Sequence, residues 1–321
     1  MNKSVLVTGG AGFIGSHLVD ALVRRGERVR VVDDLSAGNL SNLKPVRAKV
    51  EFIRGDIRDE RVMRRAVKGV GILYHQAALR SVPKSVDRPM DYHEVNTTAT
   101  LQMLRLAKEA GVRRVVYASS SSVYGDKTPL PQKESLFPTP QSPYAASKLA
   151  QEIYAVMFSR LYGLETVGLR YFNVFGPRQS LENRYAVVVP KFITSLLAGK
   201  PPPIHGDGKQ TRDFTYVENV VQANLKAGKA RGVSGQVFNV ASGVTHSVLE
   251  LARKLNGELG LRIQPKFFPP RVGDVRHTWA DIAKARRLLG YRVGVEFEEG
   301  LGRTAAWFRR HRTDVSLGDF G

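Results

Sequence analysis

The chain has 321 residues, of which 42% are hydrophobic and 24% charged, an ordinary balance for a globular protein with one large or two moderate domains. It contains no cysteine, which excludes disulfides, thiolate catalysis and cysteine-based metal sites. The formal net charge is +20, but the basic clusters are spread over most of the chain without interleaved aromatic residues, so a basic surface is favoured over nucleic-acid binding.

Short apolar segments alternate with helical segments in the first half of the chain. The predicted strands cover residues 4–8, 28–33, 50–53, 70–74 and 114–118, and the predicted helices cover 13–25, 59–68 and 94–110. Two later strands are expected at 166–172 and 236–241. This alternation is typical of an α/β fold with a doubly wound parallel sheet.

The composition of the sequence changes near residue 176. Proline and glycine cluster in GPRQ, GKPPPIHGDGK and KFFPPRVGD, between predicted helices at 187–198, 217–229 and 247–258. Loop-rich segments of this kind often supply ligand contacts. We therefore expect two domains, a larger one comprising residues 1–175 and about 214–243, and a smaller C-terminal substrate-binding one comprising about 176–213 and 244–321.

No apolar run approaches the roughly 18 residues of a membrane span. The apolar start of the chain, SVLVTGG, lacks a basic leader and is interpreted as a strand, not as a signal peptide. A cytoplasmic protein with no membrane partner is therefore expected.

Residues 8–15, TGGAGFIG, follow the first predicted strand and open a helix. Their glycines allow a tight turn and let backbone N–H groups and the helix N-terminus approach a pyrophosphate. Asp33 ends the second strand, where a carboxylate can accept a hydrogen bond from an adenosine ribose hydroxyl and would repel a 2′-phosphate. NAD is therefore predicted in preference to NADP. Asp56, after the third strand, can accept from the adenine amino group.

Ser142 and Pro143 predict the start of a helix, because serine is a good N-cap and proline suits the first helical position. Tyr144 and Lys148 then lie one turn apart on the same face. A tyrosine that acts as a base near neutral pH needs its pKa lowered by roughly 3 units, and a neighbouring ammonium or a positively charged nicotinamide favours the phenolate. Together with the glycine loop, the pair is interpreted as catalytic.

The glycine loop, the serine-rich stretch YASSSSVYG and Tyr-x-x-x-Lys together resemble the extended short-chain dehydrogenase/reductase family, over essentially the whole chain. The resemblance implies a Rossmann domain in which Tyr144 is the general acid/base, Lys148 lowers its pKa and orients the nicotinamide ribose, and a serine binds the substrate hydroxyl. That serine corresponds to Ser120, with Ser121 and Ser122 as alternatives because the run of four serines leaves the register open. Related dehydratases have an Asp-Glu pair at the positions of Ser121 and Ser122, so dehydration is disfavoured.

For the cofactor, the resemblance implies contacts from the glycine loop, from the ends of several strands and from the catalytic helix. The expected residues are Gly9, Gly12, Phe13, Ile14, Gly15, Asp33, Asp34, Asn39, Asp56, Ile57, Ala77, Asn96, Tyr144 and Lys148. His75 and His277 are interpreted as structural, and no metal site is predicted because the sequence shows neither a carboxylate cluster nor a histidine pair.

Three motifs of the second half, RYFNVFGPRQ, GDGKQTRDFTYVEN and RVGDVRH, resemble those of nucleotide-sugar 4-epimerases. By that resemblance Asn173 contacts the diphosphate sugar, together with Ser120, Ser121 and Tyr144. Arg212 and Arg271 hold the diphosphate, for which the planar guanidinium is well suited. Asp274 accepts from the uridine ribose.

Two further stretches, HQAALRSVPKS and YAVVVPKF, look closest to bacterial UDP-N-acetylglucosamine 4-epimerases. That likeness places Ser81 beside the sugar and adds Val188 to the substrate site. Thr278 is small at a position where a bulky tyrosine would exclude a 2-acetamido group. UDP-N-acetylhexosamines are therefore expected to fit, and the same space leaves UDP-glucose and UDP-galactose open as further substrates.

The sequence is thus interpreted as an NAD-dependent UDP-sugar 4-epimerase that works through a transient 4-keto sugar. Two alternatives stay open: another nucleotide-sugar enzyme on this scaffold, such as a UDP-glucuronate 4-epimerase, a decarboxylase or a reductase, and an NAD-binding regulator without activity. Helices 94–110 and 144–160 resemble the pair that forms a four-helix dimer interface in the family, so a homodimer is expected.

Overall fold

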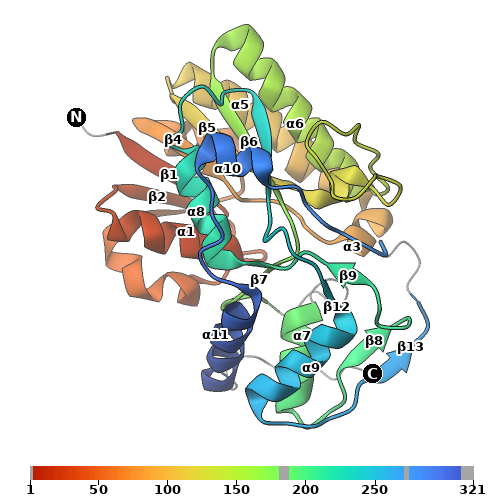
Figure 1. The fold of residues 1–321 in the computed structure, drawn as a ribbon. Coiled ribbons are helices and arrows are strands. Elements are labelled where there is room, and N and C mark those ends of the chain that lie inside the picture. Colours follow the sequence, from red (N-terminus) through yellow and green to blue (C-terminus); the bar gives the residue numbers. More distant parts are fainter. Residues whose placement is uncertain (1–2, 181–187, 271–274, 312–321) are drawn as a thin grey trace.

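The computed structural model in Figure 1 describes residues 3–180, 188–270 and 275–311. Its centre is a seven-stranded, all-parallel sheet in the order β11-β6-β5-β4-β1-β2-β3. The strands are β1 (Ser4–Thr8), β2 (Val29–Asp33), β3 (Val50–Arg54), β4 (Val70–His75), β5 (Arg114–Ser120), β6 (Glu165–Tyr171) and β11 (Gln236–Val240). The predicted α/β fold with a doubly wound parallel sheet is confirmed.

Helices cover both faces of the sheet, as buried parallel strands require. Within β1, Val5 and Val7 point into one apolar core and Leu6 into the other, the alternation expected of a strand. The first core is closed by α1 (Phe13–Arg24), the 3₁₀ helix η1 (Leu40–Lys49), α8 (Val217–Ala227) and α10 (Ala283–Leu289). The second core is closed by α2 (Glu60–Val67), α5 (Ala99–Glu109) and α6 (Pro143–Tyr162).

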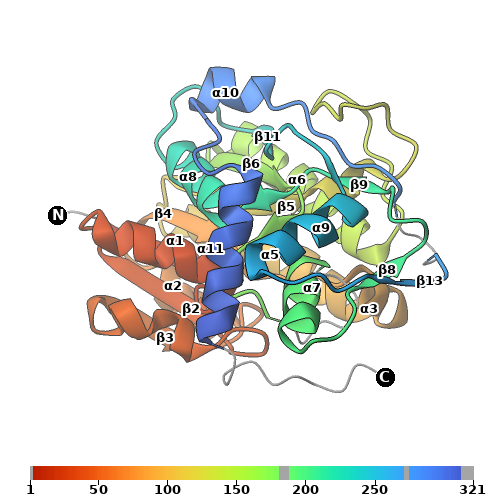
Figure 2. The ribbon, with the colours of Figure 1, turned by 60° about the horizontal axis from the view of Figure 1, so that its bottom comes forward.

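A third apolar core lies beside the sheet and is covered by α7 (Val188–Leu197), α9 (Val248–Leu259) and α11 (Phe297–Arg310), which pack against one another (Figure 2). At its centre Phe175 packs against Phe214, Tyr216 and Phe297, with ring centroids 5.6 to 6.3 Å apart. Its three helices belong to the ranges predicted for the smaller domain, whereas Phe175, Phe214 and Tyr216 belong to those predicted for the larger one. α10 differs, because its Ala285 and Leu289 pack with the sheet. The division into two domains stays a proposal.

Pairs of short strands connect this region. β7 (Val174–Phe175) pairs with β10 (Thr215–Tyr216), β8 (Pro203–His205) with β13 (Lys266–Phe268), and β9 (Thr211–Arg212) with β12 (His246–Ser247). The last of these pairs is antiparallel, and it brings two distant segments of the chain together beside the third core.

The segment between β4 and β5 differs from the single helix predicted at 94–110. It forms α3 (Val82–Asp87), α4 (Pro89–Tyr92), a π-helical turn η2 (His93–Thr98) and then α5. The wider turn directs Asn96 at the loop after β4, where its side chain accepts from the Leu79 N–H and donates to the Leu79 carbonyl, both at 2.9 Å. Such π-turns are frequent near functional sites because they redirect one side chain.

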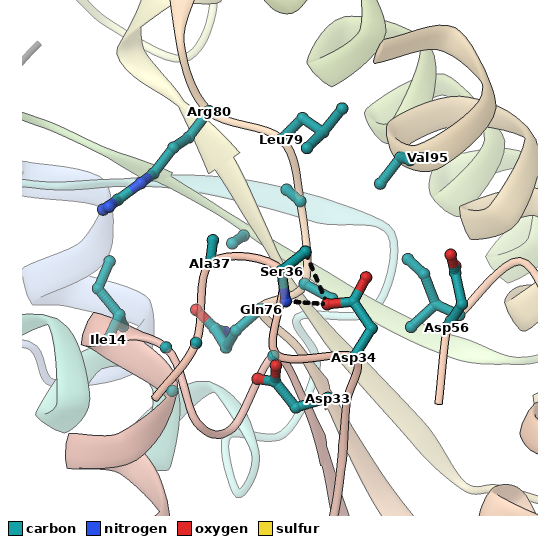
Figure 3. Close-up of a pocket in the computed structure, with 18 of the residues that line it drawn as sticks. Ile14, Asp33, Asp34, Ser36, Ala37, Asp56, Gln76, Leu79, Arg80 and Val95 are labelled. Carbon is teal, nitrogen blue, oxygen red and sulfur yellow. Dashed lines mark hydrogen bonds between the residues drawn. The ribbon is translucent and has the colours of Figure 1, made fainter. Parts of the chain in front are cut away.

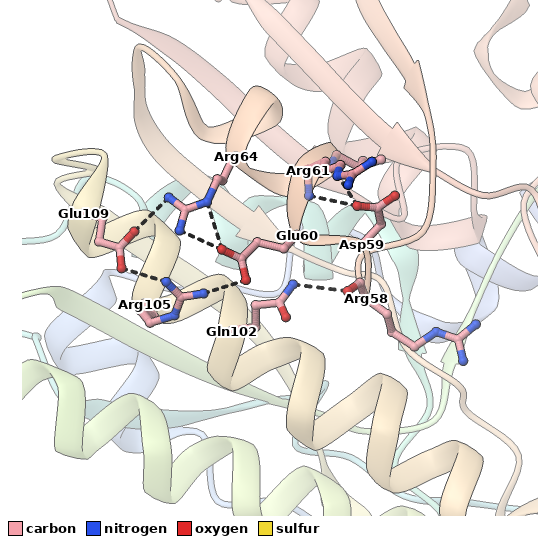
Figure 4. Close-up of polar contacts among 9 residues, drawn as sticks. Arg58, Asp59, Glu60, Arg61, Arg64, Gln102, Arg105 and Glu109 are labelled. Carbon is pink, nitrogen blue, oxygen red and sulfur yellow. Dashed lines mark hydrogen bonds and ion pairs between the residues drawn. The ribbon is translucent and has the colours of Figure 1, made fainter.

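Four charged side chains link α2 to α5 on the surface (Figure 4). Glu60 and Glu109 each contact both Arg64 and Arg105, at 2.6 to 3.0 Å, and the four groups form a closed ring of ion pairs. Two of the many arginines on the surface are therefore paired with carboxylates.

Candidate active site

A cleft of about 400 Å³ opens at the carboxyl ends of the parallel strands. The chain leaves β1 and β4 towards opposite faces of the sheet, and such a switch point is where open α/β sheets bind ligands. The loops after β1, β2, β3 and β4 line the cleft, with Ser119 of β5 and Tyr171 of β6. Tyr144 and Lys148 of α6 line the same space, so the glycine loop and the Tyr-Lys pair share one cavity.

The glycine loop turns so tightly that two of its positions admit no side chain. Gly9 has a φ of +68°, and a Cβ added at Gly15 would lie 2.0 Å from the Gly9 carbonyl oxygen. At Gly12 an added Cβ would meet only that same oxygen, at 3.2 Å, so this position is open towards the cleft that it lines. The first N–H groups of α1, which begins at Phe13, have no partners within the helix and are suited to bind an anion there.

Asp33 ends β2 with a buried carboxylate beside this loop. Its Oδ2 accepts from the Ala11 N–H and its Oδ1 from the Leu35 N–H, each at 2.9 Å. Burial raises the pKa of Asp33, and these two hydrogen bonds oppose the rise because they favour the ionised form. Asp34 follows and accepts from the N–H and hydroxyl of Ser36 (Figure 3). Two adjacent carboxylates at this wall disfavour a ligand phosphate.

Asp56 is already paired within the chain. Arg58 donates to its Oδ2 from Nη2 at 2.6 Å and from Nε at 2.9 Å, and this hydrogen bonding lowers the pKa of Asp56. Both residues line the cleft. A ligand group that donates to Asp56 would therefore share the carboxylate with Arg58.

Tyr144 lies in the first turn of α6, which starts as the sequence predicts: Ser142 Oγ accepts from the Ala145 N–H at 3.1 Å, and Pro143 is the first helical residue. The tyrosine ring packs edge-to-face against Tyr92, with centroids 6.3 Å apart. Burial raises the pKa of Tyr144, while a hydrogen bond with Ser120 and the charge of Arg80 oppose that rise. The phenol is thus held against the end of β5.

Lys148 lies one turn further along α6 and is buried. Its Nζ donates to the Ala118 carbonyl at 2.8 Å and to Gln151 Oε1 at 3.2 Å. Burial lowers the pKa of Lys148 to about 7, against the opposing effect of Glu152. The ammonium and its neutral form are therefore both accessible near neutral pH.

His75 bridges β1 to α5 below the cleft. Thr100 Oγ1 donates to the Asn96 carbonyl at 2.7 Å, so at the 3.0 Å contact between Thr100 and His75 the ring Nε2 is the donor. Nδ1 then accepts from Thr8 Oγ1 at 2.7 Å. Burial lowers the pKa of His75 to about 3, which keeps the ring neutral and agrees with its interpretation as a structural residue.

Two of the residues predicted to bind substrate contact each other beyond the end of β6, and a third, Arg212, precedes Asp213, whose carbonyl accepts from Asn173. Asn173 Nδ2 donates to Thr278 Oγ1 at 2.9 Å, and Arg212 Nη1 donates to the Thr211 carbonyl at 2.9 Å. Asp213 holds the group together by accepting from Ser242 and from the N–H groups of Gly243 and Ala280. Three segments that are distant in sequence are joined at this point.

Comparison with known proteins identifies the family. The model of the NAD dependent epimerase/dehydratase family matches residues 5–241. The chain belongs to this family. Its fold and its cofactor, NAD, are therefore those expected from the sequence, and it is an NAD-dependent epimerase-type enzyme of the extended short-chain dehydrogenase/reductase group.

Three similar proteins illustrate the range of substrates. The chain is 42% identical to UDP-glucose 4-epimerase of Mycolicibacterium smegmatis, over 95% of this chain and 98% of that protein. It is 40% identical to the structure of UDP-N-acetylglucosamine 4-epimerase from Methanobrevibacter ruminantium M1 in complex with UDP-N-acetylmuramic acid, with a TM-score of 0.92 and coverage of 97% and 99% of the two chains. It is 33% identical to UDP-glucuronate 4-epimerase of Thermodesulfobacterium geofontis, over 95% of this chain and 96% of that one.

Most of the predicted cofactor residues line the cleft of this epimerase-family fold. Asn39 and Asn96 are the exceptions. Asn39 caps η1 by accepting from the Ser41 N–H at 2.9 Å, and Asn96 is buried behind the Leu79 loop. Both hold loops that form the cleft, and a direct contact of either with NAD stays a prediction.

The predicted substrate residues are more scattered. Ser81 is 1% exposed and caps α3 by accepting from the Lys84 N–H at 3.3 Å. Ser121 opens the 3₁₀ turn η3 (Ser121–Tyr124) after β5, and Val188 begins α7 and packs on the third core. Arg271 and Asp274 lie outside the described residues. Their roles stay predictions.

Several cleft residues were not predicted from the sequence. Gln76 and Tyr171 hydrogen-bond to each other at 3.1 Å, and Arg80, Arg88 and Asp91 line the cleft near Tyr144. Gln76 and Tyr171 stand at the carboxyl ends of β4 and β6, and this position in an α/β sheet is a signal that could have identified them.

In the described part of the chain, no helix combines the length and the apolar character that a membrane span requires. Nor do its His, Asp and Glu side chains form a group of three or more that could hold a metal ion.

Proposed function

We propose that this protein is a 4-epimerase of UDP-hexoses, acting on UDP-N-acetylglucosamine and UDP-N-acetylgalactosamine, on UDP-glucose and UDP-galactose, or on both pairs. The observation that carries the proposal is the placement of Tyr144 and Lys148, one turn apart on α6, in the cleft that the glycine loop opens. The similar proteins whose names include UDP-glucose and UDP-N-acetylglucosamine 4-epimerase support it.

The residues of the cleft fit NAD. The open side of Gly12 and the N-terminus of α1 would hold the diphosphate, and the carboxylate of Asp33 would accept from the adenosine ribose. When bound, NAD supplies a reversible hydride acceptor and a positive charge that favours the phenolate of Tyr144.

Tyr144 would act on the sugar 4-hydroxyl as general base while hydride leaves C4. Ser120 would hydrogen-bond the same oxygen, and this supports Ser120 over Ser121 and Ser122 as the catalytic serine. Lys148, fixed on the Ala118 carbonyl, would supply its ammonium to the phenolate and the nicotinamide ribose. The 4-keto sugar then rotates within the site, so that hydride returns to the opposite face of C4. Tyr144 gives the proton back to the oxygen, and no net oxidation occurs.

The UDP part would be held by the group beyond β6. Arg212 suits a diphosphate, and Asn173 and Thr278 would face the sugar. Thr278 has a small side chain, and the hydrogen bond from Asn173 holds it in one orientation. This leaves room for a 2-acetamido group at the position that we assign to the sugar.

A second candidate is UDP-glucuronate as the substrate. Arg80 lines the cleft and acts on Tyr144 through its charge, and a guanidinium near the C4 position suits the carboxylate that UDP-glucuronate has at C5. A relative named UDP-glucuronate 4-epimerase supports this candidate.

The test is incubation of the purified protein with UDP-GlcNAc, UDP-glucose or UDP-glucuronate, followed by proton NMR of the mixture. The proposal predicts the 4-epimer of at least one of the first two sugars. The epimer of UDP-glucuronate alone would support the second candidate, and net NADH or carbon dioxide release would contradict both.

A further inference from the structure

A buried ion pair lies directly behind the candidate catalytic residues. Glu152 of α6 and Arg170 of β6 form two parallel hydrogen bonds, Nε to Oε1 at 2.9 Å and Nη2 to Oε2 at 2.7 Å, and each side chain is only 5% exposed. Neither residue lines the cleft. Burying two charges costs desolvation free energy even in good geometry, so a gain in stability does not by itself explain an ion pair at this place.

The pair is connected to the site through the end of β5. Ser119 donates from Oγ to Glu152 Oε1. Its two neighbours are Ala118, whose carbonyl accepts from Lys148, and Ser120, which is hydrogen-bonded to Tyr144. The strand residues that contact Lys148 and Tyr144 are thus anchored from behind by one carboxylate.

Glu152 also follows Lys148 by one turn of α6, so the two side chains lie on the same face of the helix. Its negative charge raises the pKa of Lys148, against the effect of burial. Arg170 holds the same carboxylate in a fixed orientation and adds a positive charge.

We propose that Glu152 and Arg170 are positioning residues for the Tyr144–Lys148 pair, anchoring the end of β5 and balancing the charge around Lys148. This inference rests on the proposed function, because it takes Tyr144 and Lys148 as the residues that carry the chemistry.

Two other titratable groups near Lys148 and Glu152 are neutral. His75 of β4 and Tyr117 of β5 are both buried, which lowers the pKa of the histidine to about 3 and raises that of the tyrosine well above its usual value. On α6 itself stand Tyr144 and Glu152, and Arg80 acts on Tyr144 from the loop after β4. Removing the charge of Glu152 therefore makes the site more positive, and removing that of Arg170 makes it more negative.

The test compares Glu152→Gln, Arg170→Gln and the double variant, with Arg170→Lys as the charge-preserving control. The first readout is kcat against pH. We expect both limbs of the profile to move to lower pH by roughly one unit in Glu152→Gln and to higher pH in Arg170→Gln. The double variant and Arg170→Lys should have limbs close to those of the unmodified protein.

A second readout does not depend on activity. Titration of the ¹³C-labelled lysine ε-carbons by NMR, with Lys148→Met to assign the signal, should show Lys148 losing its proton at lower pH in Glu152→Gln and at higher pH in Arg170→Gln. An inactive protein that still shows these opposite shifts would contradict the proposed function and not the charge balance.

Limbs and titrations that shift in the same direction, or not at all, would overturn the inference and leave the ion pair as a structural element. If Glu152→Gln does not fold, Arg170→Gln against Arg170→Lys decides the question, since only the first of these removes the positive charge.

Discussion

Lys148 donates to a backbone carbonyl in a site that desolvates its ammonium, and its pKa of about 7 is the result of that burial. A lysine with this pKa stabilises a phenolate when the lysine is charged, and it can also release its proton near neutral pH. Tyr144 experiences the opposite effect, because burial raises its pKa and the hydrogen bond with Ser120 opposes the rise. At the scale of the residue, burial in the cleft moves the two pKa values apart, that of Lys148 down and that of Tyr144 up.

Two glycines of the same loop should respond differently to alanine. In Gly15→Ala the new methyl would lie 2.0 Å from the Gly9 carbonyl oxygen, so we expect a lower unfolding temperature and weak NAD binding. In Gly12→Ala the methyl would enter the cleft and meet only the Gly9 oxygen, at 3.2 Å. This variant should keep its unfolding temperature and lose NAD affinity by more than about tenfold. Calorimetry of NAD binding and thermal unfolding measure the two effects separately, and equal unfolding temperatures for the two variants would contradict the account.

At the scale of the element, α6 is the helix on which the site depends. Its start was predictable because Ser142, Pro143 and Tyr144 combine a cap, a fixed φ and a functional side chain in three consecutive residues. The central strands of the sheet were predictable for a related reason: β1, β4 and β5 are short, largely apolar runs that the sheet buries on both faces.

The region before α5 could not be predicted in the same way. Its π-turn depends on Asn96 reaching Leu79 and Ser147, contacts between segments far apart in the sequence that no local pattern records. Ser81 shows the same limit. Its resemblance to a sugar-binding position is a local signal, whereas its role as the cap of α3 depends on how the loop after β4 folds.

Two helix caps offer a matched comparison. Ser142 caps α6 and Ser247 caps α9, each through a hydrogen bond to a backbone N–H of the first turn, at 3.1 and 3.0 Å. Alanine at either position should cost about 1 kcal/mol of unfolding free energy. Only Ser142→Ala should also lower kcat, since α6 carries Tyr144. Denaturant unfolding and steady-state kinetics test this, and an equal loss of kcat in Ser247→Ala would contradict the assignment of the site to α6.

At the scale of the whole molecule, Asp213 joins the sheet to the region that we assign to the substrate. Its buried carboxylate accepts four hydrogen bonds, two from Ser242, one from Gly243 and one from Ala280. Burial raises the pKa of Asp213 to about 6, against these hydrogen bonds. The Asp213 N–H also donates to Thr278 Oγ1 at 3.4 Å, so Thr278 is held by the same junction.

Asp213→Asn tests this junction. The amide NH₂ would face N–H donors in place of a carboxylate oxygen, which should cost about 1–3 kcal/mol and raise the KM for the UDP-sugar more than it lowers NAD affinity. Asp207→Asn is the control, because Asp207 pairs with Arg276 on the surface and should change neither constant by more than about twofold. An unchanged KM in Asp213→Asn would show that the junction does not position the substrate.

The most direct test of the central claim follows the hydrogen at C4. UDP-[4-²H]GlcNAc and UDP-[4-²H]glucose would be incubated with the protein, and with Tyr144→Phe, and the products analysed by NMR. A 4-epimer that keeps its deuterium at C4, formed by the unmodified protein and reduced at least about a hundredfold in Tyr144→Phe, is the predicted result. Exchange of that deuterium with solvent, epimerisation at another carbon, or full activity of Tyr144→Phe would contradict the account.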